Sequence, residues 1–382
     1  MRTSQDRILT THVGSLPRAA ELAEILLRID KGETDDSGHF ADVIARSVHE
    51  VLCRQAEVGV DIPSDGEQGK VGYATYMMDR LNGFGGDSER KIALDLAAYP
   101  ELREKIGRMI GAQQFRRASC IGPITVRDWG PLQEDIHNLK SAMRAAGVEE
   151  AFMNSASPGL VSAFQPNRYY PSHEEYVEAI AEVMREEYEQ IVNAGLLLQL
   201  DCPDLAMARH TGFQDLGEKD FLRRAEFHVE VLNAALANVP ADRCRFHVCW
   251  GNYEGPHDFD IAVGKIMKII LKAKPSAILF EAANARHEHE WTTWAAARIP
   301  GDKILIPGTI DTRSNILEHP ELVAQRIERF AAIVGRERVI AGTDCGFGTF
   351  AGYGRLDPEI AWRKLGSLAA GATIASERLW GT

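Results

Sequence analysis

The chain has 382 residues, of which 45% are hydrophobic and 26% are charged, and its formal net charge is −12 at pH 7. This composition is typical of a globular protein with a large buried core. The acidic balance disfavours binding to nucleic acid or to an anionic membrane surface. The sequence has no run of about 18 apolar residues that would predict a membrane span.

The six cysteines are scattered along the chain, at Cys53, Cys120, Cys202, Cys244, Cys249 and Cys345. The N-terminal residues lack the apolar stretch of a signal peptide. Together these features indicate reduced thiols and a cytoplasmic protein, not a disulfide framework.

A unit of helix, glycine and short apolar strand recurs along the chain. It occurs first as a predicted helix at 40–58 and last as a predicted helix at 320–334. In the clearest example, Ser172 and Glu175 have the spacing of a capping box at a helix start. An apolar stripe at helical spacing follows, and Gly195 stands where a left-handed C-terminal residue is expected.

About eight strands are predicted, at residues 8–13, 60–62, 118–121, 196–200, 245–249, 277–281, 304–307 and 339–341. Strands that alternate with helices in this number predict a (β/α)8 TIM barrel, here as a single domain over residues 1–382. An open doubly wound sheet shares the alternation, but no Gly-x-Gly-x-x-Gly motif follows a predicted strand. The stretches 83–116 and 128–171 exceed a simple barrel, and we interpret them as helical insertions at its rim.

Four good zinc ligands stand at the ends of predicted strands, where a barrel places its active site. His247 and Cys249 are two residues apart, so strand alternation puts both on one face. Glu281 and Cys345 end two further strands. Each residue alone would be read as a core histidine or a buried cysteine, but their common position at strand ends favours zinc.

The same residues carry a resemblance to a known family. The matching segments are Thr10–Pro17, Asp65–Glu67, Leu81–Phe84, Ile121–Thr125, Leu198–Asp201, His247–Cys249, Glu281 and Asp344–Gly346. In this order they are similar to the catalytic barrel of cobalamin-independent methionine synthase, over nearly the whole chain. The resemblance implies that zinc binds His247, Cys249, Glu281 and Cys345. It also implies that Ser15, Glu67 and Asp201 hold the amino-acid end of homocysteine.

The expected chemistry is the transfer of a methyl or alkyl group to a small-molecule thiol. A free thiol has a pKa near 8.5 and is mostly protonated at neutral pH, whereas Zn²⁺ removes that proton. Two thiolates and one carboxylate outweigh the charge of the metal, which keeps a bound substrate sulfur nucleophilic. We therefore predict zinc-dependent methylation of homocysteine or a related thiol, as in methionine biosynthesis. The alkyl donor and the oligomeric state stay open.

Two alternatives remain. Single-barrel relatives of the family include epoxyalkane:coenzyme M transferases, which add a thiol to an epoxide and need an acid for the alkoxide. Candidate acids are His12, His257 and His287, and Arg18 and Lys70 are candidate partners for a sulfonate. The third hypothesis is a non-catalytic protein with structural zinc, although structural ligands normally have short Cys-x₂₋₄-Cys spacing.

Overall fold

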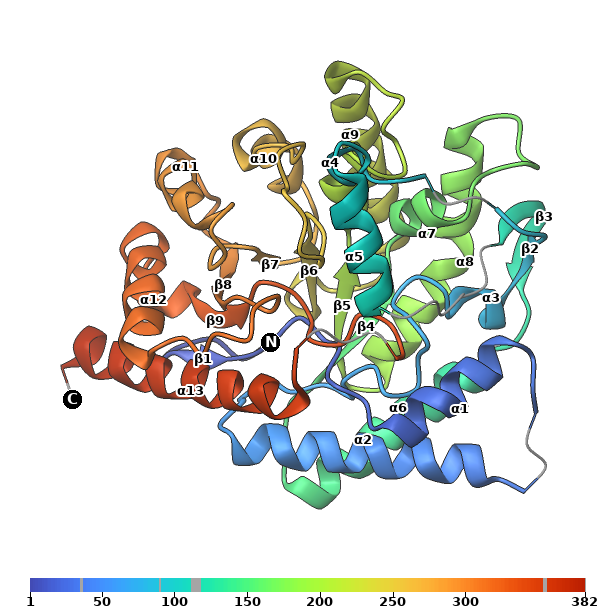
Figure 1. Cartoon of the computed structure of the whole chain (residues 1–382). Helices are drawn as coiled ribbons and strands as arrows, with labels where there is room; N and C mark the ends of the chain where they lie inside the picture. Colours follow the sequence, from blue (N-terminus) through green and yellow to red (C-terminus); the bar gives the residue numbers. More distant parts are fainter. Residues whose placement is uncertain (35–36, 89–90, 111–117, 353–355, 382) are drawn as a thin grey trace.

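The computed structural model describes residues 1–34, 37–88, 91–110, 118–352 and 356–381 (Figure 1). Its main sheet is parallel, with seven strands in the order β1-β9-β8-β7-β6-β5-β4. The strands are β1 (Leu9–Thr10), β4 (Phe152–Ala156), β5 (Leu197–Asp201), β6 (Cys244–Val248), β7 (Ala277–Phe280), β8 (Ile304–Ile310) and β9 (Ile340–Thr343).

The two edges of this sheet approach the same short segment. Parallel bridges join Thr11, just after β1, to Ile62, and Ser64 to Phe152 of β4. The predicted strand at 60–62 therefore appears as isolated bridges between the two edges. The structure confirms an α/β fold with a curled parallel sheet, but this sheet has seven strands and the complete (β/α)8 barrel is not confirmed.

Two sequence predictions were wrong about which strands enter this sheet. The segment 118–121 begins β3 (Ser119–Val126), which pairs antiparallel with β2 (Leu81–Gly85) in a separate two-stranded sheet. The stretch 128–171, expected to be a helical insertion, contributes β4 to the main sheet. Apolar character marks a strand but does not select its partner, because strand pairing is non-local.

The predicted insertion at 83–116 is partly helical. It contains α4 (Leu94–Ala97) and α5 (Pro100–Ile110), and its residues 111–116 lie outside the described part of the chain. In Figure 1, α5 crosses in front of the strands. The Asp95 carboxylate of α4 accepts hydrogen bonds from the Tyr253 hydroxyl at 2.6 Å and the His257 N–H at 3.2 Å. These bonds hold the insertion against the loop that follows β6.

The other helices pack around the sheet (Figure 1). They are α1 (Ala20–Asp30), α2 (His39–Glu57), α3 (Met77–Arg80), α6 (Gly130–Ala146), α7 (Pro158–Phe164), α8 (His173–Asn193), α9 (Glu218–Ala235), α10 (Val263–Ile270), α11 (Trp291–Ala296), α12 (Pro320–Val334) and α13 (Pro358–Trp380). Short 3-10 helices are η1 (Pro203–Leu205), η2 (Met207–Arg209), η3 (Ala241–Arg243), η4 (Glu288–Glu290) and η5 (Arg336–Arg338). Within the described ranges, no helix combines the length and apolar character needed to cross a membrane.

Local sequence signals account for the helix ends. The Ser172 hydroxyl accepts a hydrogen bond from the Glu175 N–H at 3.1 Å, which caps the start of α8. Gly195 follows this helix with a φ of +91°, a conformation that glycine adopts without steric cost. The helices predicted at 40–58 and 320–334 are confirmed as α2 and α12.

Candidate metal centre and substrate pocket

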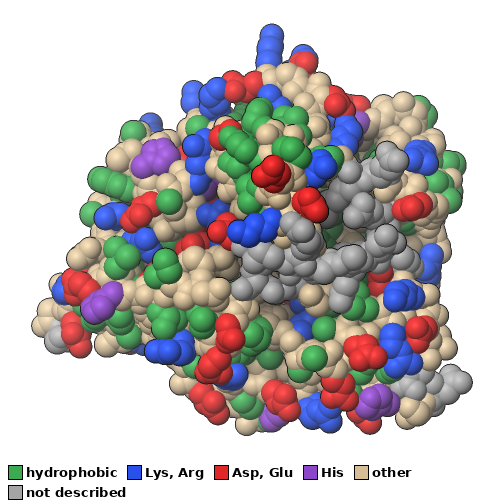
Figure 2. Space-filling view, viewed as in Figure 1, with side chains coloured by type: hydrophobic (Ala, Val, Ile, Leu, Met, Phe, Trp, Pro, Cys, Tyr) green, Lys and Arg blue, Asp and Glu red, His purple; other side chains and the backbone are tan. Residues whose placement is uncertain are grey.

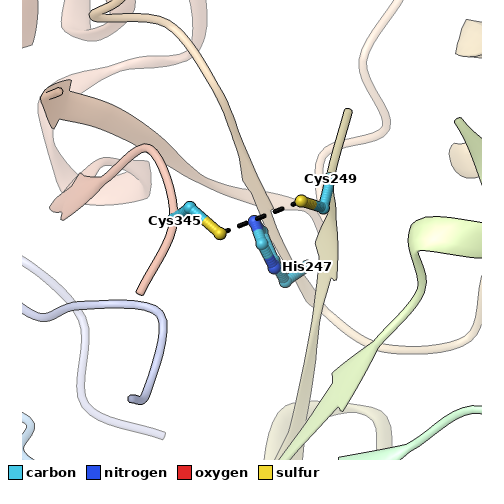
Figure 3. A group of neighbouring side chains, drawn as sticks. All are labelled: His247, Cys249 and Cys345. Atoms are coloured by element: carbon cyan, nitrogen blue, oxygen red, sulfur yellow. Dashed lines mark hydrogen bonds between the residues drawn. The ribbon is translucent and has the colours of Figure 1, made fainter. Parts of the chain in front are cut away.

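Three of the four expected zinc ligands lie together. His247 belongs to β6, Cys249 follows the same strand, and Cys345 follows β9. Their ligating atoms all lie within 4.8 Å of one another, and the side chains point toward one another in Figure 3. The two Sγ atoms are 3.8 Å apart and both cysteines are free thiols.

This donor set fits a zinc ion. Zinc takes nitrogen and sulfur ligands in tetrahedral sites, and two sulfurs bound at about 2.3 Å would lie about 3.8 Å apart. The observed Sγ–Sγ distance of 3.8 Å matches that separation. All three side chains are buried, so the centre would be shielded from bulk water.

Glu281, the fourth expected ligand, lies beside this group but is not part of it. One carboxylate oxygen accepts the Trp250 N–H at 2.8 Å, and the other accepts the Asn284 amide at 2.8 Å. The hydrogen bond with Cys345 and burial raise the pKa of the Cys249 thiol, and the Glu281 charge adds to that rise. The carboxylate is thus close enough to act electrostatically, with both oxygens hydrogen-bonded.

Asp344 joins the loop that carries Cys345 to the loop that follows Glu281. Its carboxylate accepts the backbone N–H groups of Ala282 and Ala283, both at 2.8 Å, and that of Asn284 at 2.9 Å. A Cβ atom at Gly308 would lie 2.1 Å from the same carboxylate, so only glycine leaves room for it. Asp344 therefore fixes two of the candidate ligand loops relative to each other.

A pocket of about 420 Å³ opens beside the three ligands. It is lined by Val13, Ser15, Glu67, Tyr73, Asp201, Pro203, Met207, His247, Cys249, Asn252, Cys345, Gly346 and Thr349. The structure thus brings together the three expected substrate-binding residues, Ser15, Glu67 and Asp201, with three of the expected metal ligands. Ser15 packs against Gly346, where an added Cβ atom would lie 2.0 Å from the Ser15 hydroxyl.

One side of this pocket, which we call the acidic floor, is formed by Glu67 and Asp201, and Asn154 lies behind it with its amide bonded to Asp201 at 3.1 Å. Each has a buried oxygen without a hydrogen-bond partner, namely Glu67 Oε2, Asn154 Oδ1 and Asp201 Oδ1. Burial and the Asp201 charge raise the pKa of Glu67 to about 8. Glu67 also has a φ of +56°, a strained conformation of the kind that clusters at functional sites. The lining residues that the structure describes include no Lys or Arg, so the floor suits a cationic ligand group.

Asp201 also faces the metal centre. Its Oδ1 lies 3.6 Å from His247 Nδ1, while His247 Nε2 lies 3.2 Å from the Asp344 carbonyl oxygen. Burial lowers the pKa of His247, but Asp201, Cys345 and Glu281 outweigh burial and raise it to about 9. The acidic floor and the ligand group are therefore contiguous.

Of the three candidate acids, His12 lies in the core. Its Nε2 is 2.7 Å from the Gln55 amide oxygen, and its Nδ1 accepts the Gly14 N–H at 3.2 Å. Burial lowers the pKa of His12 to about 3, so the ring is neutral. His12 does not line the pocket.

The other two candidate acids belong to a second buried group, which we call the Asp260 cluster. The Asp260 carboxylate lies 3.0 Å from His257 Nδ1 and 3.1 Å from His287 Nε2. The remaining ring nitrogens contact the Tyr253 carbonyl at 2.9 Å and the Glu290 carboxylate at 2.8 Å. Both histidines therefore have both ring nitrogens paired, and neither lines the pocket.

The two candidate sulfonate partners point away from the pocket. Arg18 donates hydrogen bonds to the carbonyl oxygens of Gly348, Glu67 and Lys70. Lys70 is buried and donates to the Asn154 carbonyl at 2.5 Å. Both cations therefore donate hydrogen bonds to backbone carbonyl oxygens next to the acidic floor.

Sequence reasoning missed two polar residues at the site. Asn154 lies in the middle of β4, a strand that was not predicted, and its amide donates to Asp201 at 3.1 Å. Asn252 follows Cys249 by three residues and donates to the Gly346 carbonyl at 2.8 Å, which joins the loops after β6 and β9. An asparagine within or just after a strand is the signal that would have found both.

Comparison with known proteins finds similarity to methionine synthases. Residues 8–100 match the family model described as the catalytic domain of cobalamin-independent synthase. The chain is 24% identical over 376 residues to a methionine synthase of Saccharolobus solfataricus, covering 97% of this chain and 95% of that protein. It is 23% identical to a methionine synthase of Sulfolobus acidocaldarius, with 97% and 93% coverage.

Solved structures show the same fold. A B12-independent methionine synthase from Shewanella sp. W3-18-1, in complex with selenomethionine, superimposes with a TM-score of 0.74 at 20% identity, covering 98% of this chain and all of that one. A putative vitamin-B12-independent methionine synthase from Listeria monocytogenes gives a TM-score of 0.65 at 19% identity, with 96% and 98% coverage.

The fold and the site therefore define an α/β protein with a curled parallel sheet and a candidate metal centre of one histidine and two cysteines near the C-terminal ends of its strands. The chain is similar to methionine synthases over nearly its whole length, and its residues 8–100 match the cobalamin-independent synthase model.

Proposed function

We propose that this chain is a zinc-dependent enzyme that transfers a methyl group to the sulfur of homocysteine, with residues 1–382 acting as one domain. One observation carries the proposal: the group of His247, Cys249 and Cys345 opens onto the same pocket as the acidic floor. Relatives that match nearly the whole chain are methionine synthases, which supports the same reaction.

His247, Cys249 and Cys345 would hold the zinc ion, and Glu281 is the fourth candidate ligand. Bound zinc would supply one effect, the loss of the thiol proton and the placement of the substrate sulfur. Asp201 orients the His247 ring from 3.6 Å, and Asp344 holds the loops of Cys345 and Glu281 together.

The acidic floor binds the ammonium group of the substrate. An ammonium group donates hydrogen bonds, and Glu67 and Asp201 each line the pocket and have a buried acceptor oxygen that lacks a partner. These oxygens and the ligand group line the same pocket, which supports a substrate whose amino-acid end lies at the acidic floor and whose sulfur lies at the ligand group. The sulfur then attacks the methyl carbon, the new S–C bond forms as the bond from the methyl group to the donor breaks, and the donor keeps the bonding electrons.

The two alternatives have less support. Epoxide opening with coenzyme M calls for a free acid and a cation for the sulfonate, but His257 and His287 have both ring nitrogens paired, and neither Arg18 nor Lys70 lines the pocket. A purely structural zinc site is closed by its protein ligands, whereas this group adjoins a pocket of about 420 Å³.

Zinc-edge X-ray absorption tests the proposal on the purified protein, alone, with homocysteine and with coenzyme M. The resting protein should show two sulfur neighbours and two nitrogen or oxygen neighbours. Homocysteine should add a third sulfur and coenzyme M should not. A protein without zinc, or a sulfur number that no thiol changes, would refute thiol activation, and a third sulfur with coenzyme M alone would favour the epoxide reaction.

A further inference from the structure

A buried arginine lies on the same strand face as the candidate ligands. Arg245 precedes His247 by two residues in β6, so strand alternation puts both side chains on one face. Arg245 is 0% exposed. In the register between β5 and β6, Arg245 pairs with Gln199 and His247 pairs with Asp201, so the arginine lies directly below the site along both strands.

All hydrogen-bond acceptors of Arg245 are neutral. Its guanidinium donates to the Gln199 amide oxygen at 2.8 Å, the Thr11 hydroxyl at 2.9 Å and the His12 carbonyl at 2.9 Å. The guanidinium carbon Cζ also lies 3.7 Å from the centre of the Phe152 ring, a cation–π contact. Among the described residues, no carboxylate lies within ion-pair distance of this guanidinium.

The buried cations of this protein fall into two groups: Lys70 and Lys303, like Arg245, donate to neutral oxygens, whereas others form ion pairs. Arg80 pairs with Glu187 at 3.0 Å, and Lys364 pairs with Glu318 at 2.8 Å. A buried charge without a counter-charge is costly, because desolvation penalises the ionised form. The compensation for Arg245 must therefore come from negative charge at a longer distance.

Burial lowers the pKa of Arg245 to about 9, and the charges of Glu150 and then of Asp201 oppose that fall. Asp201 adjoins the candidate metal centre, which would add further negative charge. Two thiolates and the Glu281 carboxylate would exceed the charge of a zinc ion by one, and Asp201 adds another negative charge beside His247. Attraction between such groups and a cation in the protein interior is screened far less than at the surface.

A hydrogen-bonded path also links Arg245 to the acidic floor. The Gln199 amide donates to the Val13 carbonyl oxygen, which accepts a second bond from the Asn154 amide at 3.0 Å. The same Asn154 amide donates to Asp201 at 3.1 Å.

We propose that Arg245 is a positioning residue whose fixed positive charge, placed below the candidate metal centre, offsets the excess negative charge of the centre and strengthens metal binding. This role rests on the proposed zinc-dependent function. The charge itself carries the effect, and the hydrogen bonds to Gln199, Thr11 and His12 keep the charge in place.

The test measures the zinc dissociation constant by competition with a chromophoric chelator. Arg245→Met removes the charge at similar volume, and Arg245→Lys keeps the charge with fewer hydrogen bonds. Arg245→Met should weaken zinc binding roughly 10- to 100-fold, the usual cost of losing a residue that supports a metal site. Arg245→Lys should bind zinc nearly as tightly as the unsubstituted protein. Lys364→Met is the matched control, because it removes another buried cation that is ion-paired away from the pocket.

Folding of each variant is checked by circular dichroism before zinc is added. If Arg245→Met does not fold, Arg245→Gln replaces it, since glutamine keeps donor groups without the charge. Equal zinc affinity in the charged and neutral variants would overturn the role of Arg245 and leave the proposed function intact. Failure of the unsubstituted protein to bind zinc would instead overturn the proposed function.

Discussion

Two groups of buried titratable side chains lie near the C-terminal ends of the strands, and they differ in whether their members line the pocket. In the Asp260 cluster, His257 and His287 each have partners for both ring nitrogens. In the candidate metal centre, the ligating atoms of His247, Cys249 and Cys345 converge on one another beside oxygens that lack partners. Unpaired groups that face a cavity, not the concentration of titratable residues, distinguish a binding site from a structural network.

The Asp260 cluster also contacts the residues that surround the candidate metal centre. The His287 ring lies 4.7 Å from the ring of Trp250, whose backbone N–H binds the Glu281 carboxylate. The Asp260 cluster also spans the loops after β6 and β7. Through Trp250, the cluster therefore helps to position Glu281 beside the candidate ligands.

The largest effect is expected when one candidate ligand is removed from the candidate metal centre. Cys345→Ser should weaken zinc binding by more than about a hundredfold, because even supporting residues of metal sites contribute 10- to 100-fold. Methyl transfer should be lost with the metal. Zinc content by atomic emission, together with turnover, checks both effects.

Cys244→Ser is the matched control, since Cys244 is also buried in β6 but begins the strand, far from the pocket. It should keep its zinc. Full zinc occupancy in Cys345→Ser would contradict the assignment of the centre.

The second test measures how the Asp260 cluster contributes to the stability of the fold at different pH values. Burial lowers the pKa of His287, but hydrogen bonds to Asp260 and Glu290 outweigh burial and raise it to about 10 from an ordinary value of 6.5. Protonated His287 thus stabilises the fold fully below about pH 6.5, and this contribution is lost as the pH rises toward 10. The free energy of unfolding should fall by about 3–5 kcal/mol over that window, and His287→Gln should remove much of the fall.

Denaturant unfolding at several pH values between 6.5 and 10 measures this difference. His39→Gln is the control, because His39 is an exposed histidine with a surface ion pair. Curves of equal slope for the unsubstituted protein and His287→Gln would show that the cluster does not hold a proton in the way described.

The third test concerns substrate recognition by the acidic floor. Glu67→Gln should raise KM for homocysteine roughly tenfold, because a hydrogen bond to a charged group contributes about 1.5–3 kcal/mol. It should leave KM for 4-mercaptobutyrate, which lacks the amino group, nearly unchanged. Steady-state kinetics with both thiols checks the contrast, and an equal rise for both would mean that Glu67 shapes the pocket without binding the ammonium group.

The sequence predicted the parts of the site that depend on local patterns. His247 and Cys249 share a strand face because of the two-residue period of a strand, and their strand is an apolar run that reads clearly. Cys345 follows an equally clear strand, β9. The positions of β6 and β9 could therefore be predicted without information on long-range contacts.

The parts that sequence reasoning missed depend on long-range contacts. β4 has the sequence Phe-Met-Asn-Ser-Ala, in which polar residues interrupt the apolar run, so it was read as part of an insertion. Asn154 lies in this strand and was therefore missed as a partner of Asp201. The pairing of His257 and His287 through Asp260 joins residues from two loops, which spacing along the chain does not reveal.

The separation of the ligands along the chain has a consequence for biosynthesis. Cys249 and Cys345 are 96 residues apart, and Ser15 from the first strand loop packs beside Gly346. While the chain is being made, His247 and Cys249 are present long before the third ligand and the pocket wall exist. If the chain binds zinc as proposed, tight metal loading would follow synthesis of the last strand, and metal occupancy would then report that the two ends of the sheet have come together.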